Sequence, residues 1–340
     1  MAGSGSDHLR DEVVLRVEDL VVQFPAPHGE TVHAVSGVSF DLDGGETLGI
    51  VGESGCGKTT VGRAVMQLEP ATDGRVELHG DDLTSLRGER LRQVRRDMQM
   101  IFQDPVSSIN PSRRIRDVVR EGLDMWAEKD GPRSAQLVDE ILVAVGLGGD
   151  DVGERRAHEF SGGQCQRICI ARALVMDPKV LILDEPVSAL DVSVQAQILN
   201  LLEQLKQRFG LTMVFISHDL AVVKNVSDRV LVMYLGKVCE IAQTDQLFDA
   251  PTHPYTQALL ASIPGNRLGL PPADELISGE LPSPLDPPSG CRFRTRCPHA
   301  DERCASDEPA LVEHQPGHWV ACHHPQAHLR PRGDDQAEAS

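Results

Sequence analysis

The 340-residue chain is poor in aromatic residues, in positive charge and in long apolar runs. Aromatic residues make up only 4% of it, too few for a surface built to stack on bases. Acidic residues outnumber basic ones by 51 to 33, and the formal charge of -18 repels nucleic acid. No run reaches the roughly 18 apolar residues of a membrane span, and the N-terminus lacks a signal-peptide core. The sequence therefore predicts an intracellular protein, soluble by itself, with no nucleic-acid partner, that reaches a membrane only through other subunits.

The strongest motif is a glycine-rich loop, residues 52–59, between a strand-like apolar run (47–51) and a run with helical apolar spacing (60–68). Its glycines let successive backbone N–H groups face one anion, and the helix start adds its positive dipole end. Lys58 supplies a charge for the β- and γ-phosphates of a nucleotide, and Thr59 supplies a hydroxyl for Mg²⁺. The residues expected to contact the nucleotide here are Gly52, Ser54, Gly55, Cys56, Gly57, Lys58, Thr59 and Thr60.

Polar side chains follow three further apolar runs. Asp184 and Glu185 end a run of four apolar residues that is typical of a strand buried on both faces. Because ligands of open α/β sheets bind at the carboxyl ends of strands, Asp184 is expected to complete the Mg²⁺ shell and Glu185 to accept a proton from an attacking water. Gln103 ends a strand-like run before a Pro-rich irregular segment, a place from which it could move with a ligand, but alone it is a weak signal. His218 ends a strand-like run whose like-placed neighbour ends in Asp184 and Glu185, which favours a functional role over a structural one.

Residues 111–160 have helical periodicity and no strand-like run, which predicts a helical insertion within an α/β domain. The insertion leads into Ser161-Gly162-Gly163-Gln164 and a further helix-like run. Ser161 is a good N-cap, and the glycine pair leaves the helix start open to a phosphate. A capped helix without a ligand is the alternative, although it leaves the glycine pair unexplained.

Phe24 ends the first strand-like run, 13–24, well before the phosphate loop. Its ring could lie over an adenine, since any base offers a π-face to an aromatic side chain. An ordinary core phenylalanine is the equally weighted alternative.

Four of the eight cysteines, Cys291, Cys297, Cys304 and Cys322, cluster after a Pro- and Gly-rich stretch, 265–290. In a reducing cytosol such a cluster predicts a metal site before a disulfide framework. The spacings are wider than the Cys-x2-Cys pairs of common zinc sites, and four thiolates also suit an iron–sulfur cluster. An iron–sulfur cluster, a zinc ion and unligated cysteines therefore all remain open.

Together the motifs resemble the ATP-binding subunit of an ATP-binding-cassette (ABC) transporter over residues 13–263. The matching segments are, in chain order, the phosphate loop 52–59, the Q-loop residue Gln103, the signature 160–164 with Phe in place of the usual Leu, the Walker B strand 180–185, the D-loop 188–191 and the switch residue His218. Further segments narrow the resemblance to dipeptide/oligopeptide permease ATPases: 102–111, 185–193, 216–220, 253–256 and 279–284.

The resemblance implies an α/β fold: a P-loop NTPase (ABC ATPase) core with an antiparallel β subdomain and a helical subdomain, plus a small Cys-rich C-terminal extension. The expected boundaries are a disordered N-terminus at 1–11, a nucleotide-binding domain at 12–264 with its helical subdomain at about 105–178, a Pro-rich connector with a four-Cys domain at 265–324, and a disordered tail at 325–340.

The resemblance also implies a mechanism in which two such subunits face head to tail. Each ATP would lie between one phosphate loop and the other subunit's Ser161–Gln164, with Asp191 nearby. Glu185 would polarise water, His218 would hold the γ-phosphate region, and Gln103 would sense Mg²⁺. The implied cofactors are ATP and Mg²⁺, together with a [4Fe-4S] cluster, or alternatively Zn²⁺, on the four C-terminal cysteines.

The implied function is an ATPase that powers uptake of dipeptides or oligopeptides at the cytoplasmic face of the cell membrane. Its partners would be a second ABC ATPase subunit, identical or homologous, two integral membrane permeases and an extracytoplasmic peptide-binding protein. Another cargo, such as nickel or a sugar-like solute, is an alternative because the ATPase does not touch the cargo. A soluble ABC ATPase acting on nucleic acid or ribosomes fits less well, since such proteins carry paired cassettes, heptad arms or basic surfaces.

Overall fold

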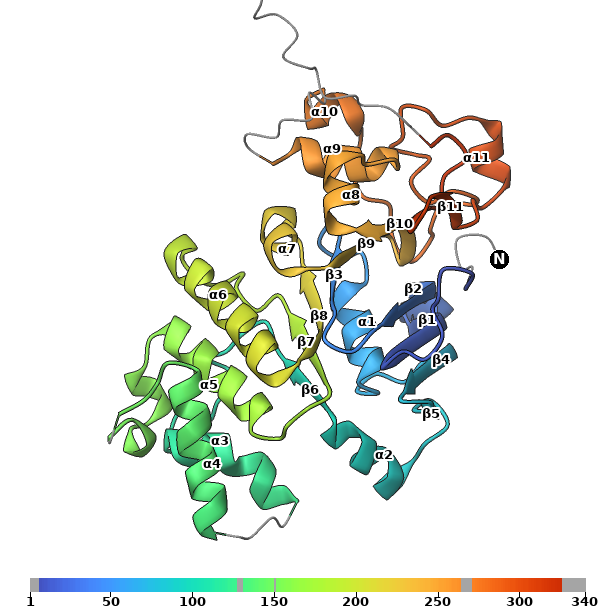
Figure 1. Ribbon diagram of the computed structural model, residues 1–340. Coiled ribbons are helices and arrows are strands. Elements are labelled where there is room, and N and C mark those ends of the chain that lie inside the picture. Colours follow the sequence, from blue (N-terminus) through green and yellow to red (C-terminus); the bar gives the residue numbers. More distant parts are fainter. Residues whose placement is uncertain (1–5, 127–130, 150, 264–270, 326–340) are drawn as a thin grey trace, which may run out of the picture.

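Figure 1 shows a computed structural model of the chain, which describes residues 6–126, 131–149, 151–263 and 271–325. Its centre is an eight-stranded sheet with the spatial order β11-β12-β10-β9-β3-β8-β7-β6. The strands from β9 to β6 are parallel, and β10, β12 and β11 continue the sheet in antiparallel fashion. Their bounds are β3 (Thr47–Val51), β6 (Met98–Ile101), β7 (Val180–Asp184), β8 (Thr212–Ser217), β9 (Arg229–Tyr234), β10 (Lys237–Gln243), β11 (Val312–Gln315) and β12 (His318–Val320).

The central strands of this sheet carry apolar side chains on both faces, which explains why they lie in the interior of the protein. Every residue of β3, β7, β8 and β9 is buried, as expected for parallel strands covered by helices on both sides. β3 pairs with β8 on one side and with β9 on the other. The loop that follows β3 therefore leaves from the interior of the sheet and not from an edge.

A second sheet has four antiparallel strands in the order β2-β1-β4-β5. Its inward side chains share one apolar cluster with the first helix and the main sheet, including Phe40, Leu48 and Val61. This contact places the second sheet against the helix that follows the phosphate loop. The strands are β1 (Leu15–Pro25), β2 (Thr31–Leu42), β4 (Asp73–Leu78) and β5 (Asp81–Asp82).

Between β6 and β7, the described residues form helices and turns without a named strand. Figure 1 shows α3, α4 and α5 gathered in one lobe beside the main sheet. None of the described helices combines the length and the apolarity required to cross a bilayer. The helices are α1 (Lys58–Val65), α2 (Gly88–Arg96), α3 (Ile115–Met125), α4 (Gly131–Ala144), α5 (Gly162–Leu174), α6 (Val192–Phe209), α7 (Leu220–Val226), α8 (Thr244–Asp249), α9 (Pro254–Ala261), α10 (Ala273–Leu276) and α11 (Glu302–Ser306).

In the N-terminal segment, where the sequence predicts disorder over 1–11, the described residues 6–11 include an arginine that contacts acids of the folded domain. The Arg10 guanidinium lies 2.6 Å from Asp41 and 2.6 Å from Glu46, and Arg229 lies 2.7 Å from the same Asp41. Burial alone would raise the pKa of Asp41, but hydrogen bonds and charges from the two arginines outweigh it and lower that pKa. This charge network ties the N-terminus to both sheets. Residues 1–5 lie outside the described part of the chain.

The C-terminal extension joins the main sheet, because β12 pairs with β10. A buried contact fixes it there: the ring of His318 lies 2.5 Å from the Glu240 carboxylate, and both side chains are fully buried. The other hydrogen bonds to Glu240 come from the backbone N–H groups of Thr252 and His253. Residues 264–270 of the expected connector and 326–340 of the expected tail lie outside the described residues.

Because one buried carboxylate accepts all three of these bonds, we expect Glu240→Ala to detach β12 from β10. The His318 ring and the backbone N–H groups of Thr252 and His253 would then stay buried without this partner. We expect their loss of bonding to lower the free energy of unfolding by about 3 to 5 kcal/mol. The measurement is urea denaturation followed by Trp319 fluorescence in a Trp126→Phe background, since these are the two tryptophans of the chain. The exposed Glu280→Ala is the matched control. Equal urea midpoints for Glu240→Ala and Glu280→Ala would contradict the assigned role of Glu240.

Candidate active site

Two glycines of the phosphate loop are required by backbone packing. A Cβ on Gly52 would lie 2.2 Å from the carbonyl oxygen of Met233, and one on Gly57 would lie 2.2 Å from that of Ala34. Both glycines have positive φ, 155° and 103°, and so does Gly55 at 80°, where the space around a Cβ is open. The loop is thus wedged between a carbonyl of β9 and a carbonyl of β2, a fit that larger residues would block.

Lys58 starts α1 and is 5% exposed. Its ammonium group donates hydrogen bonds to the carbonyl oxygens of Gly52 at 2.7 Å and Glu53 at 2.9 Å. The charge is therefore held over the same loop whose N–H groups are expected to receive phosphate. The remaining predicted contacts of this stretch lie along the loop and the first turn of α1: Ser54 is exposed, Cys56 is buried, and Thr59 and Thr60 are half-buried.

Thr59 and Asp184 meet as the sequence predicts for a shared magnesium shell. The Thr59 hydroxyl donates to the Asp184 carboxylate at 2.8 Å, although the two residues are 125 positions apart. Burial raises the pKa of Asp184, and the neighbouring charge of Glu185 raises it further. A desolvated carboxylate next to a hydroxyl gains from a hard cation, so this pair suits Mg²⁺.

Glu185, Gln103 and His218 form one hydrogen-bonded group at the ends of β7, β6 and β8. The Glu185 carboxylate accepts from the Gln103 side-chain amide at 3.0 Å and from the His218 ring Nδ1 at 3.1 Å. Glu185 itself has a left-handed backbone with φ of 48°, uncommon for a residue with a side chain. Such an outlier at a strand end aims the carboxylate sideways and is typical of functional positions.

Ser161 caps α5 as predicted from its residue type. Its hydroxyl accepts the Gln164 N–H at 3.4 Å, and its own N–H donates to the Gln164 side chain at 2.9 Å, which makes a capping box. Packing requires a glycine at position 163, which the sequence did not reveal: a Cβ there would lie 2.5 Å from Val194 on α6. Gly162 is exposed, so the helix start stays open to an approaching group.

The structure does not bring Ser161–Gln164 to the phosphate loop of the same chain. Within the described residues, no hydrogen bond or ion pair joins the two segments, and Figure 1 shows α5 and α1 in separate parts of the molecule. Asp191 is exposed at the start of α6 without a side-chain capping bond. Phe24 pairs with Val32 and is half-buried against the apolar cluster beneath the second sheet.

The four C-terminal cysteines lie close enough to interact electrostatically. Burial raises the pKa of Cys291 to about 11 and that of Cys322 to about 12, and the other thiols of the group add to both shifts. The thiols of Cys297 and Cys304 also have raised pKa values, chiefly through burial. Cys239 on β10, which the sequence placed among the scattered cysteines, interacts with Cys291 and Cys322. Such a collection of thiols fits a metal group.

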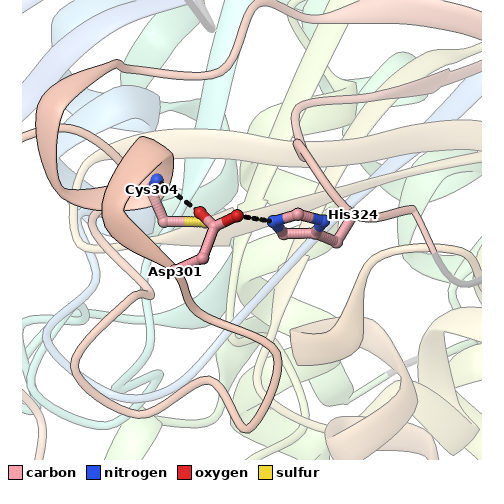
Figure 2. A group of neighbouring side chains, drawn as sticks. All are labelled: Asp301, Cys304 and His324. Carbon is pink, nitrogen blue, oxygen red and sulfur yellow. Dashed lines mark hydrogen bonds and ion pairs between the residues drawn. The ribbon is translucent and has the colours of Figure 1, made fainter.

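A second possible metal set includes one of these cysteines. Figure 2 shows Asp301, Cys304 and His324 turned toward one another, with their candidate ligand atoms within 4.8 Å. The Asp301 carboxylate caps α11 by accepting the Cys304 N–H at 3.0 Å, and it lies 2.9 Å from the His324 ring. Among the described residues, this is the one such trio that would suit a single ion.

An exposed apolar groove beside Gln103 was not anticipated from the sequence. It opens between the end of α1, strand β6 and helix α3, and the Arg172 side chain closes one wall by donating to the Ser108 carbonyl at 2.6 Å. Its residues are scattered along the chain, so no run of the sequence signals it. The apolar lining comprises Met66, Leu68, Met98, Met100, Phe102, Met125, Trp126 and Met176.

Comparison with known families supports the motif assignments at the level of the family. Residues 35–188 match the family model described as ABC transporter. Residues 239–304 match the family model described as oligopeptide/dipeptide transporter, C-terminal region. The second match begins on β10 and ends in α11, so it contains three of the four clustered cysteines.

Curated relatives match over almost their entire length. The oligopeptide transport ATP-binding protein AppF of Bacillus subtilis is 49% identical over 321 residues, which cover 92% of this chain and 97% of AppF. OppF of Salmonella typhimurium, with the same description, is 48% identical over 327 residues, which cover 92% of this chain and 96% of OppF.

Solved structures share the fold. The structure of CbiO1 from Clostridium perfringens, part of the CbiONQ ABC transporter complex, aligns with a TM-score of 0.62 and 28% identity over 70% of this chain and 91% of that one. The dimeric ATP-binding cassette MJ0796 bound to ADP and Pi aligns with a TM-score of 0.61 and 26% identity. This alignment covers 68% of this chain and 98% of that one. The predicted fold class is confirmed. The chain therefore belongs to the family of ABC transporter ATP-binding proteins that carry the oligopeptide/dipeptide transporter C-terminal region.

Proposed function

We propose that this chain binds and hydrolyses ATP to power the import of short peptides through a membrane transporter. The observation that carries the proposal is the contact of Glu185 with Gln103 and His218 at adjoining strand ends, next to the Thr59–Asp184 pair. A proton acceptor, a magnesium pair and a phosphate loop are the parts that phosphoryl transfer to water needs. Peptide cargo is supported by the names of the relatives, which are oligopeptide transport proteins, and by the match of the C-terminal region.

Each group has a definite task in this proposal. Lys58 would neutralise the β- and γ-phosphates, and the loop N–H groups would hold their oxygens. Thr59 and Asp184 would hold Mg²⁺, which supplies charge neutralisation for the phosphates. Glu185 would accept a proton from the attacking water, while His218 and Gln103 keep its carboxylate aimed at the same point.

The exposed tip of α5 supports a composite site shared by two subunits. Ser161, Gly162 and Gly163 present an open helix start that makes no described bond to the loop of its own chain. A helix N-terminus favours anions, so a second subunit placed head to tail could cover the ATP with this tip and with Asp191. Phe24, half-buried on β1, would lie beside the adenine in the same assembly.

We expect Glu185→Gln to keep ATP affinity and to lower ATP turnover by about 10²- to 10⁴-fold, because the amide cannot accept the proton of water. Binding of a fluorescent ATP analogue and phosphate release are the two measurements. Lys58→Ala should instead weaken binding, by about tenfold or more, because a charge-assisted contact is lost.

The exposed Glu203→Gln on α6 is the control for the Glu185 variant. Near-normal hydrolysis in Glu185→Gln would exclude Glu185 as the base.

The apolar groove beside Gln103 is the proposed contact for the membrane permeases. Large apolar side chains are unusually exposed on its rim, with Leu68 at 47% and Met125 at 64%. Exposed apolar grooves of this kind accept an amphipathic helix of a partner. The partners proposed are two permeases and a second ATPase subunit, supplied with cargo by an extracytoplasmic peptide-binding protein, which places this chain peripherally on the cytoplasmic face of the membrane.

We expect Leu68→Asp combined with Met125→Asp to weaken association with the permeases by about tenfold or more, because charges would be buried on docking. ATP binding to the isolated chain should stay unchanged. The measurement is co-purification with the permeases from detergent-solubilised membranes.

Val143→Asp on α4, where the native side chain is 63% exposed outside the groove, is the matched control. Equal recovery of permeases with both variants would exclude the groove as the docking site.

We also propose a [4Fe-4S] cluster on Cys291, Cys297, Cys304 and Cys322. A single zinc ion bonds its thiolates at about 2.3 Å, which brings the sulfurs within about 4 Å of one another. Among the described residues, no three thiols lie within 4.8 Å of one another, while all four interact electrostatically. Four neighbouring thiols without a closely spaced trio are compatible with a cluster, whose sulfur ligands bind different iron atoms. The trio Asp301, Cys304 and His324 is the zinc alternative.

Anaerobically purified protein should contain about four iron and four acid-labile sulfide per chain. Cys304→Ser should lose both, whereas Cys165→Ser on α5 should keep them. Elemental analysis and visible absorption are the measurements. Stoichiometric zinc without sulfide would replace the cluster by the trio in Figure 2.

A further inference from the structure

The phosphate loop is contacted by Arg296 of the C-terminal extension and by Tyr255 of α9, the helix that precedes the extension. Its second residue, Glu53, lies 2.7 Å from the guanidinium of Arg296. The backbone N–H of the same Glu53 donates to the Tyr255 hydroxyl at 2.8 Å. The two contacts join positions 243 and 202 residues apart. Both partners fall inside the matched C-terminal region, 239–304.

An aromatic cluster packs Phe293 of the extension against Tyr234 of β9 and Tyr255 of α9. Tyr255 and Tyr234 are fully buried, and Phe293 is 2% exposed. Their three rings pack against one another with centroids 4.8 to 5.4 Å apart. Arg296 is 8% exposed, and its guanidinium lies 5.8 Å from the Tyr234 ring centroid. The cation is thus fixed by packing before it meets Glu53.

A second route leads from the extension to the loop. Arg292 donates to the Leu235 carbonyl and, at 2.9 Å, to the Ser36 hydroxyl. The next residue, Gly236, donates its N–H to the carbonyl of Cys56 in the loop at 2.8 Å. The loop is therefore contacted near its start and near its end by elements that the extension holds in place.

The charge of Glu53 makes the Arg296 contact relevant to nucleotide binding. A carboxylate on the loop would oppose the phosphates that its N–H groups and Lys58 are expected to attract. The Glu53 carbonyl also accepts from the Lys58 ammonium at 2.9 Å, so a shift of Glu53 would move the charge of Lys58 with it. Arg296 both neutralises the carboxylate and fixes its position.

We propose that Arg296 is a positioning residue for ATP: through Glu53 it holds the phosphate loop, so that nucleotide affinity depends on the four-cysteine extension. The proposal rests on nucleotide binding at 52–59 and is independent of the cargo and of the metal identity.

The test compares Arg296→Met, Glu53→Gln and the double variant as full chains with a fluorescent ATP analogue and Mg²⁺. Arg296→Met should raise the dissociation constant and the KM for ATP about five- to tenfold, with kcat changed less than about twofold. Adding Glu53→Gln should cause no further loss, because the unpaired carboxylate is gone. Arg296→Lys, which keeps the charge but not the planar fork, should bind with intermediate affinity.

Arg294→Met is the matched control, since the side chain of that arginine, in the same segment, donates to the carbonyl and hydroxyl of Ser289 and not to the phosphate loop. Iron content and thermal midpoint of each variant separate a positioning effect from loss of the extension. The proposal would be overturned if folded Arg296→Met bound the ATP analogue with wild-type affinity. It would also be overturned if the losses of affinity in the two single variants added up in the double variant. Failure of the wild-type chain to bind the analogue would overturn the proposed function instead.

Discussion

The close approach of the phosphate loop to two backbone carbonyls is the constraint on which the site depends. Gly52 and Gly57 leave no room for a Cβ against Met233 of β9 and Ala34 of β2. One loop therefore fixes the spacing between the main sheet and the second sheet. Because the loop is held from both sides, its N–H groups keep their direction without help from a ligand, which is the meaning of preorganisation in such a site.

Parallel pairing then gathers the remaining polar groups. β6 pairs with β7 and β7 pairs with β8, so their carboxyl ends reach one edge together. Gln103, Glu185 and His218 meet there although 82 and 33 positions separate their contacts along the chain. The positive φ of Glu185 completes the arrangement by turning its carboxylate toward both partners. A sheet register that packs apolar side chains thus also assembles the polar site.

The glycine loop and the strand ends could be predicted because each is a local pattern: a special residue next to an apolar run. The charge network around Asp41 could not, since its members Arg10, Glu46 and Arg229 are indistinguishable from surface charges in the sequence. β12 has three residues, too short for a periodic signal, and its pairing depends on the buried His318–Glu240 contact. Arg296 and Glu53 are likewise joined only by the fold.

The polar groups at the centre of the site satisfy one another in the structure. Lys58 donates to two loop carbonyls, Thr59 donates to Asp184, and Glu185 accepts from Gln103 and His218. These bonds can be exchanged for bonds to a nucleotide, a cation or water, provided that each displaced protein partner finds a new partner in the bound group or in water. Exchange of one hydrogen bond for another changes the free energy little, about 1 kcal/mol per bond. Affinity must then come from charge and from covering the nucleotide. In the proposals made above, Arg296 supplies part of that charge control at the loop, and the exposed, capped tip of α5 supplies the cover from a second subunit.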